Sequence, residues 1–310
     1  MIAFIFPGQG SQAVGMGKAL ADGFPVCRAT FDEADAALGD PISAVCFDGP
    51  ADRLMLTENT QPAILTVSVA IWRLLDSRGF APSFMAGHSL GEYSAHVAAG
   101  TISFPDAVRI VRRRGRYMQE AVPVGTGAMA AILGLDAERV SRACSEAAQG
   151  EVVSAANLNA PGQVVIAGNR EAVARAGERA KQAGAKRVVP LPVSAPFHCA
   201  LMKPAEERLA PELRALAVSN PRVPVVANVD AEPKRDGASA VEALVQQVSR
   251  PVRWEDSVRR LASEGVRTYV EVGPGTVLGG LVRKIHREAT VLGIESPEGL
   301  AAVEALFQSQ

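Results

Sequence analysis

Short runs of apolar residues without polar interruption recur along the chain, and stretches with helical spacing separate them. The runs cover residues 2–6 (IAFIF), 83–87, 223–229, 267–272 and 290–293. A strand that is apolar on both faces has to be covered on both faces, as parallel strands are in α/β proteins. The alternation therefore predicts an α/β fold in which a mostly parallel sheet lies between helices.

Helices are predicted where apolar residues recur every three or four positions. They cover about 14–20, 26–38, 61–75, 90–99, 105–122, 238–249, 254–264 and 276–287. The best candidate for a membrane span, 64–75, is short and contains Arg73, so we expect no transmembrane segment. The apolar start has no basic leader and no cleavage site, and we interpret it as a buried strand of a cytoplasmic protein rather than a signal peptide.

The region 124–191 breaks the regular alternation. Its predicted elements are a strand at 128–135, a helix at 137–148, strands at 151–157 and 163–167, a helix at 170–183 and a strand at 187–191. The order β-α-β-β-α-β is that of a ferredoxin-like unit. We therefore expect a large α/β domain made of residues 1–123 and 192–310, with a small ferredoxin-like domain, residues 124–191, inserted into it. A length of 310 residues suits this organisation.

Composition and charge exclude several functional classes. The 32 Lys and Arg residues balance 33 Asp and Glu residues, whereas a protein that mainly binds nucleic acid is usually basic. The four cysteines form no CxxC pair and the four histidines no HExxH motif, so we expect reduced thiols, no disulfide scaffold and no metal site. The chain also lacks the third glycine of a dinucleotide fingerprint and a GxxxxGK[ST] loop, so no nucleotide cofactor is expected.

The run Gly87–Glu92 (GHSLGE) follows a predicted strand and opens a predicted helix. It fits GxSxG, in which small residues allow a sharp strand-to-helix turn that presents the serine at the carboxyl end of the sheet. The helix N-terminus behind the serine favours a developing negative charge. Ser89 is therefore the candidate nucleophile, and a plain turn with Ser89 as helix cap is the alternative.

A serine nucleophile needs a general base. His198 ends the proline-containing loop 192–198 (PVSAPFH), a position at which α/β proteins often place catalytic side chains. A surface or capping role is the alternative. If His198 is the base, the rate should rise with pH through a pKa near the usual value of about 6.5. His88 adjoins the serine and is expected to pack beneath the turn, whereas His96 and His286 are interpreted as helix residues in solvated surroundings without a role.

One arginine falls on the apolar face of a predicted helix. Arg114 shares a helical stripe with Ala107, Ile110, Val111, Met118 and Ala121. A buried guanidinium needs an anionic partner. That partner is either a ligand or an internal carboxylate such as Glu92, and the stripe alone does not decide between them.

Glycines also follow the first predicted strand, in residues 6–12 (FPGQGSQ). They would let backbone N–H groups approach a ligand, and an ordinary turn is the alternative. Together with TQPA at 60–63, Arg114-Gly115, MQEAVP at 118–123, NLNAPGQ at 157–163, PFH at 196–198 and EVGPG at 271–275, these motifs resemble the malonyl-CoA:acyl carrier protein transacylases of fatty acid synthesis. The resemblance covers essentially the whole chain.

The resemblance implies an acyltransferase with a hydrolase-like large domain and no cofactor. Malonyl-CoA would load a malonyl group onto Ser89, and the phosphopantetheine thiol of an acyl carrier protein would collect it. His198 would serve as base and then as acid, oriented by the backbone carbonyl of Gln247. The backbone N–H groups of Gln9 and Leu90 would form the oxyanion hole.

The resemblance also implies how the acyl group is recognised. Arg114 would hold the malonyl carboxylate through its planar guanidinium. Gln61 and His88 would line the pocket. Phe197 matches a position that is bulky in related acyltransferases preferring malonyl over methylmalonyl. Transferases of polyketide or malonate decarboxylase pathways, a serine thioesterase and a non-catalytic carrier-protein scaffold are the alternatives.

The partners implied are an acyl carrier protein and a coenzyme A thioester, and the family suggests a monomer. Carrier proteins of this type are acidic, so basic clusters are candidate docking sites. Three clusters are expected beside the cleft between the domains: Arg112, Arg113 and Arg116; Lys181, Lys186 and Arg187; and Arg283, Lys284 and Arg287.

Overall fold

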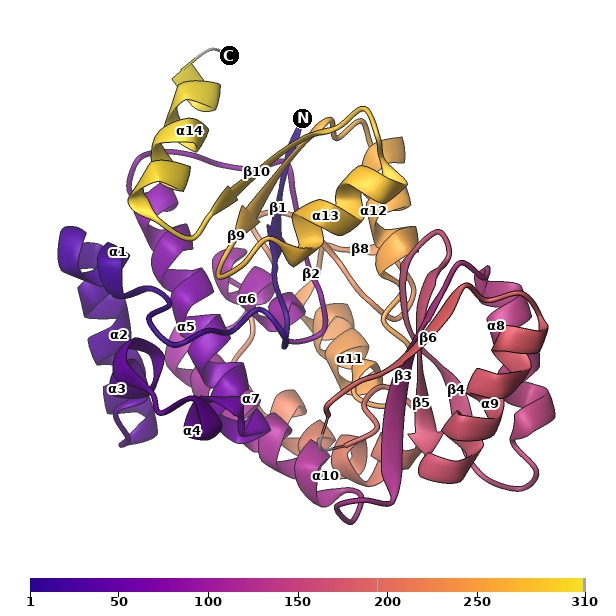
Figure 1. Cartoon of the computed structure of the whole chain (residues 1–310). Coiled ribbons are helices and arrows are strands. Elements are labelled where there is room, and N and C mark those ends of the chain that lie inside the picture. Colours follow the sequence, from indigo (N-terminus) through magenta and orange to yellow (C-terminus); the bar gives the residue numbers. More distant parts are fainter. Residues whose placement is uncertain (194, 309–310) are drawn as a thin grey trace.

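Two β-sheets lie side by side in the computed structural model, which describes residues 1–193 and 195–308 (Figure 1). The larger sheet has the strand order β10-β9-β1-β2-β7-β8, and the smaller has the order β4-β5-β3-β6. In Figure 1 the small sheet and its two helices form the right-hand part, and both chain ends lie at the top of the large part. The predicted fold class is confirmed.

The large sheet is parallel except at one edge. Its parallel strands are β1 (Ile2–Phe6), β2 (Phe84–Gly87), β7 (Val225–Val226), β9 (Thr268–Val272) and β10 (Thr290–Ile294). The edge strand β8 (Pro233–Lys234) runs antiparallel to β7. Strand β7 is much shorter than the predicted 223–229, because the chain turns back directly after it and the Ala227 N–H donates to the Glu232 carbonyl.

Strand β1 shows why the sheet is covered on both faces. Every residue of β1 is buried. Phe4 and Phe6 belong to a core that includes helix α5 (Thr57–Asp76), whereas Ile5 packs into a second core with α12 (Trp254–Ser263) and α13 (Val277–Ile285). Because successive side chains point to opposite faces of the strand, β1 packs against a helical layer on each face of the sheet.

Further helices complete the large part. They are α1 (Lys18–Gly23), α2 (Pro25–Leu38), α3 (Ile42–Asp48), α4 (Ala51–Met55), α6 (Leu90–Ala98), α7 (Phe104–Glu120), η1 (Ala200–Met202), α10 (Lys203–Arg214), α11 (Gly237–Gln247) and α14 (Pro297–Gln308). The helix predicted at 14–20 begins only at Lys18, because Gly15 and Gly17 have φ of 95° and 75°, outside the helical region. No helix in the described part of the chain is long and apolar enough to cross a membrane.

The small sheet is antiparallel throughout. It consists of β3 (Gly127–Leu133), β4 (Val153–Ala160), β5 (Gln163–Asn169) and β6 (Arg187–Pro190), with α8 (Ala137–Ala147) and α9 (Arg170–Gln182) against it. Both the chain order β-α-β-β-α-β and the strand order are those of a ferredoxin-like unit.

Backbone hydrogen bonds join the small sheet to the large part. The Leu158 N–H donates to the Val252 carbonyl at 2.9 Å, and the Val252 N–H donates to the Ala156 carbonyl at 2.9 Å. Val252 lies two residues before α12, which packs on the large sheet, so these hydrogen bonds connect β4 to the large part. They hold β4 in position beside the carboxyl end of β2 and the Ser89 turn.

Candidate active site

Ser89 lies in a strained turn between β2 and α6. Its φ of 53° and ψ of −106° lie outside the regions that non-glycine residues usually occupy. Backbone atoms surround both glycines so closely that a side chain would not fit. A Cβ added to Gly91 would lie 2.0 Å from the Phe6 carbonyl oxygen, and one added to Gly87 would lie 1.9 Å from the Gly91 carbonyl carbon. Both glycines of GxSxG are therefore sterically required, as the motif predicted.

His198 lies directly against this serine. Its Nε2 is 2.7 Å from Ser89 Oγ, and its Nδ1 is 2.9 Å from the backbone carbonyl oxygen of Gln247. Because a carbonyl only accepts hydrogen bonds, Nδ1 carries the proton and Nε2 presents its lone pair to the serine hydroxyl. This is the tautomer that a general base requires.

The protonation of His198 differs from the sequence-based expectation. Burial, together with the positive charge of Arg114, lowers the pKa of His198 to about 3. The imidazole is therefore neutral over the whole physiological range. For the free enzyme we therefore expect no rise of the rate through a pKa near 6.5, in contrast to the expectation from the sequence.

Arg114 extends from α7 to the other side of the serine and is only 1% exposed. Its Nη2 donates to Ser89 Oγ at 3.1 Å and to Gln247 Oε1 at 2.9 Å, and its Nη1 donates to Gln61 Oε1 at 2.8 Å. The Tyr93 ring lies 5.3 Å from the guanidinium carbon. Neutral groups thus hold the guanidinium in position.

No salt bridge from Arg114 exists among residues 1–193 and 195–308, so the internal partner that Glu92 could have supplied is not used in this way. Burial lowers the pKa of the Arg114 guanidinium, with Tyr93 and Glu92 opposing that shift. An arginine nevertheless stays charged in proteins. A buried, preoriented cation beside a serine hydroxyl is suited to bind a carboxylate.

A cavity of about 140 Å³ collects most of the predicted site residues. Those that line it are Gln9, Gln61, His88, Ser89, Arg114, Phe197 and His198. Leu90, the first residue of α6, is buried directly behind Ser89, and Gln247 reaches the site from α11. A second cavity of about 230 Å³ shares Gln9 and His88 with the first and extends to α13.

The remaining histidines lie away from Ser89 Oγ. His88 packs beneath the turn as expected, with Nε2 2.8 Å from Asn159 Oδ1 and its ring against Trp254. The interpretation of His96 as solvated is wrong: it is fully buried, and burial lowers its pKa to about 3. His286 lies just after α13, with Nδ1 3.1 Å from the Tyr269 hydroxyl.

Three polar residues at the site were not found from the sequence as site residues. Asn157 of β4 lines both cavities, and Asn228 and Glu92 form hydrogen bonds directly behind Ser89. The signal for Asn228 is its position at the carboxyl end of a parallel strand, two residues beyond β7. Its partners Gly87, Ser89 and Glu92 could not be predicted from the spacing, because they lie more than 130 positions away.

A larger cavity of about 600 Å³ lies against α9 and β6 in the small part. Its lining includes several arginines but neither serine nor histidine. Within the part of the chain that the structure describes, no group of three or more His, Cys, Asp or Glu side chains is placed to hold a metal ion. The four cysteines are buried free thiols.

Comparison with known proteins gives close relatives over nearly the full length. Residues 3–306 match the acyl transferase domain family. The malonyl CoA-acyl carrier protein transacylase of Escherichia coli strain K12 is 55% identical over 301 residues, covering 97% of this chain and 97% of that protein. The protein of the same name from Bacillus subtilis strain 168 is 50% identical and covers 96% of this chain and 94% of its own length.

Solved structures agree with these relatives. An acyl carrier protein S-malonyltransferase from Vibrio cholerae superposes with a TM-score of 0.96 at 50% identity, covering 97% of this chain and 99% of that chain. A type II PKS acyl-carrier protein in complex with its malonyl-transacylase matches with a TM-score of 0.95 at 51% identity, covering 97% and 98%.

The fold and the family match together define this chain as an acyltransferase. Within that class it belongs to the family of malonyl CoA-acyl carrier protein transacylases, to which the motifs of the sequence pointed.

Proposed function

We propose that this chain transfers a malonyl group from malonyl-CoA to the phosphopantetheine thiol of an acyl carrier protein, through a malonyl ester of Ser89. The observation that carries the proposal is the position of Arg114. A buried guanidinium without an anionic partner is costly. Here its Nη2 lies 3.1 Å from Ser89 Oγ, where the free carboxylate of a malonyl group attached to that oxygen can pair with it.

In the first half-reaction, Ser89 Oγ attacks the thioester carbonyl carbon while its proton moves to His198 Nε2. The oxyanion that forms is stabilised by the backbone N–H groups of Gln9 and Leu90, the latter belonging to the first turn of α6, whose N–H groups have no partner within the helix. When the carbon–sulfur bond breaks, His198 returns the proton to the departing thiolate. Coenzyme A leaves with a free thiol.

In the second half-reaction the roles are reversed. The carrier's thiol gives its proton to His198 Nε2 and attacks the ester carbonyl carbon. The Ser89 oxygen then leaves with that proton, and the malonyl thioester of the carrier is released. The Gln247 carbonyl at Nδ1 keeps the imidazole in the required orientation through both steps.

The pocket residues are proposed to shape the acyl site around this pair. Gln61 fixes the guanidinium of Arg114 through its Oε1. Phe197 and His88 limit the space beside the serine, which at about 140 Å³ is suited to a small acyl group. No cofactor takes part in these steps.

A serine thioesterase is less well supported. The common hydrolase triad has an acid at Nδ1 of its histidine. Here a backbone carbonyl occupies that place. We propose fatty acid synthesis as the pathway served; the similarity to the malonyl-transacylase seen with a type II PKS carrier supports a polyketide pathway as the second candidate.

We propose that the carrier docks near Arg283, Lys284 and Arg287. In the first candidate cluster each arginine pairs with an acidic residue, Asp40, Glu212 or Glu120, and in the second Lys181 pairs with Glu178. In the third, no residue forms a salt bridge among the described residues, and Lys284 Nζ donates to Gln163 Oε1 at the rim of the second cavity. Free positive charge at that rim is suited to an acidic partner.

The organisation of the chain is part of the proposal. We propose that residues 124–191 form an inserted domain and that residues 1–123 and 192–310 form the catalytic domain. A monomer, which the family resemblance suggests, is proposed as the active unit. The buried free thiols support a reducing compartment, the cytoplasm.

Intact-protein mass spectrometry with malonyl-CoA tests the proposed function. The wild-type chain should gain the mass of one malonyl group, and Ser89→Ala, which keeps the fold, should gain none. An adduct on folded Ser89→Ala would overturn the assignment of the nucleophile. Hydrolysis of malonyl-CoA by the wild-type chain without an adduct would favour the thioesterase.

A further inference from the structure

We propose that Asn228 is a positioning residue that holds the strained turn at Ser89 in its reactive conformation. The inference rests on the proposed role of Ser89 as the nucleophile. Asn228 lies in the turn between β7 and β8 and is completely buried. It touches neither the cavity nor the hydroxyl of Ser89, so it acts through the backbone of the turn.

The side chain of Asn228 bridges the two ends of the turn. Its Oδ1 accepts the backbone N–H of Ser89 at 2.7 Å, and its Nδ2 donates to the backbone carbonyl of Gly87 at 2.7 Å. One partner is a donor and the other an acceptor, so the amide orientation is unambiguous. Both partners are polar backbone groups that would otherwise need another hydrogen bond.

The backbone conformation of Ser89 explains what this bridge controls. Its ψ of −106° sets the plane of the Ser89–Leu90 peptide and so the direction of the Leu90 N–H. Its φ and ψ together set the direction of the side chain, whose Oγ lies 2.7 Å from His198 Nε2. A relaxed turn would therefore misplace the nucleophile and one donor of the oxyanion hole together.

Asn228 is itself held from the opposite side. Its backbone N–H donates to Glu92 Oε2 at 2.9 Å, and its carbonyl accepts the Arg253 N–H at 3.0 Å. Gln247 Nε2 donates to Asn228 Oδ1 and Glu92 Oε2, at 3.3 and 2.7 Å. The network therefore connects the residue that orients His198 with the turn that carries Ser89.

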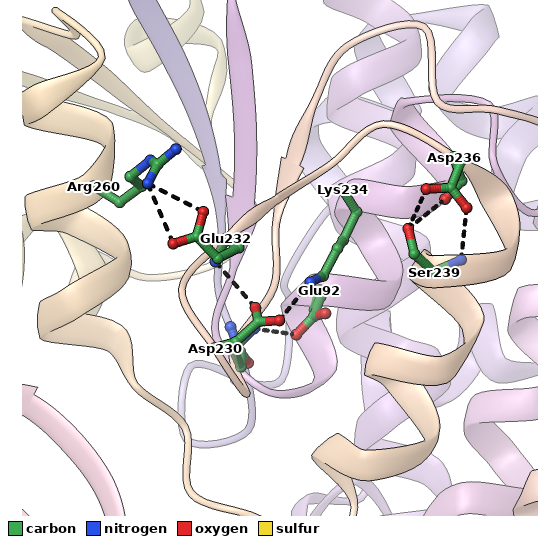
Figure 2. Close-up of polar contacts among 8 residues, drawn as sticks. Glu92, Asp230, Glu232, Lys234, Asp236, Ser239 and Arg260 are labelled. Atoms are coloured by element: carbon green, nitrogen blue, oxygen red, sulfur yellow. Dashed lines mark hydrogen bonds and ion pairs between the residues drawn. The ribbon is translucent and has the colours of Figure 1, made fainter.

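The turn between β7 and β8 is closed by its own contacts. Asp230 accepts from Lys234 Nζ at 2.5 Å and from the Glu232 N–H at 3.0 Å. Figure 2 shows these contacts and the side chain of Glu92, which points toward the same turn. These hydrogen bonds hold the turn that carries Asn228 in position next to Ser89.

Asn228→Ala is the primary test, with Asn169→Ala as the matched control. Asn169 Oδ1 also accepts a backbone N–H, that of Val152 at 2.8 Å, in a part-buried position of the small sheet. We expect Asn228→Ala to slow malonyl-enzyme formation in single-turnover rapid-quench experiments by on the order of 10²-fold, because small misplacements of reacting groups have such effects. The Kd for malonyl-CoA, measured in a Ser89→Ala background, should change by less than about threefold.

A role in stability alone predicts a different pattern. Folded Asn228→Ala would then form the malonyl enzyme at a rate within about threefold of wild type, as Asn169→Ala is expected to do. That result would overturn the proposal. So would an equal loss of rate in both variants.

Asn228→Asp keeps the proposal testable if the alanine variant does not fold. A protonated carboxyl can accept from Ser89 and donate to Gly87, as the amide does, whereas a carboxylate cannot donate. Complete burial and the neighbouring carboxyl of Glu92 favour the protonated form at this position; His198 stays neutral in this range. The single-turnover rate relative to wild type should therefore recover as the pH falls from about 8 to about 5.5. A rate close to wild type at pH 8, or a loss that does not recover, contradicts the proposal.

The experiments distinguish a failure of the positioning role of Asn228 from a failure of the proposed function of Ser89. If Asn228→Ala reacts at the wild-type rate while Ser89→Ala forms no adduct, only the positioning role is wrong. If Ser89→Ala still forms an adduct, the nucleophile is wrong and the role of Asn228 falls with it.

Discussion

The two walls of the active-site cavity differ in what they contribute. The wall from the large part carries Ser89, His198 and Arg114, together with every hydrogen-bonding partner that orients them. The wall from the small sheet carries Met129 and Asn157, with no charged side chain. We therefore propose that the large part carries out the chemistry and that the small sheet limits access to it.

The kinds of sheet explain the difference. In the large part, parallel strands end at one edge, where the first turn of α6 presents N–H groups next to the serine. An antiparallel sheet has no such common edge, since its strands end alternately on both sides. The small sheet contributes Met129 of β3 and Asn157 of β4 to the cavity instead.

Among the changes that compare the two walls, His198→Ala is expected to have the largest effect. Loss of base and acid together should lower the rate of both half-reactions by about 10³-fold, measured by single-turnover loading and by transfer to the carrier. The matched change on the other wall, Asn157→Ala, should cost less than about tenfold and act mainly on KM. An equally severe loss of malonyl loading in Asn157→Ala and His198→Ala would contradict this division of roles between the two walls.

A smaller effect is expected from a change at Lys284 of α13, which contacts Gln163 of the small sheet. Lys284→Glu should raise the KM for the carrier protein several-fold at low salt and leave malonyl loading almost unchanged, because only the carrier brings an extended acidic surface. Arg142→Glu, on the exposed face of α8 and outside the three clusters, is the control for the change in charge. Equal effects of both variants would place the carrier elsewhere.

Among these tests, a change of pH between about 5 and 8 is expected to have the smallest effect on kcat/KM. Because the pKa of His198 is lowered to about 3, the kcat/KM for malonyl-CoA, which reports the free enzyme, should show no limb near 6.5 between about pH 5 and 8. Burial raises the pKa of Glu92 to about 7, so any shallow inflection there should vanish in Glu92→Gln. A full limb near pH 6.5 that persists in Glu92→Gln would contradict the neutral, buried base.

The same pKa shifts affect stability. The unfolded chain binds protons at His96 and His198 below about pH 6.5, whereas the folded chain does so only near pH 3. Burial raises the pKa values of Glu92 and Glu271 to about 7, so these carboxyls bind more protons in the folded state and offset the histidines down to about pH 4.5. Below that pH the unfolded state binds more protons, and the free energy of unfolding should fall as the pH is lowered from about 4.5 to about 3, which denaturant titrations at several pH values measure.

Much of the site could be predicted because local sequence determines it. The glycines around Ser89 and the arginine in an apolar stripe are local signals, and both led to the observed positions. Helix α10 was missed although its buried Ala205, Leu209 and Leu213 have helical spacing. The other omissions depend on contacts across the fold: the burial of His96 has no local signal, and Asn228 is set apart only by its partners at positions 87, 89 and 92.

Recognition of the acyl group is proposed to depend on Arg114, which binds the carboxylate. Acetyl-CoA lacks that carboxylate, and a site built on such a contact rejects a ligand without it by on the order of 10⁴-fold. Arg114→Ala should therefore lower malonyl transfer steeply and leave acetyl transfer equal or better. Arg114→Lys should recover only part of the malonyl activity, because a point charge cannot form two parallel hydrogen bonds.

The most direct measurement is the ratio of kcat/KM for malonyl-CoA to that for acetyl-CoA on folded Arg114→Ala. We predict that the ratio falls by several orders of magnitude and that the preference is inverted. A purely internal role of Arg114 would lower both activities together. An unchanged ratio would therefore contradict the account and remove Arg114 from the substrate site.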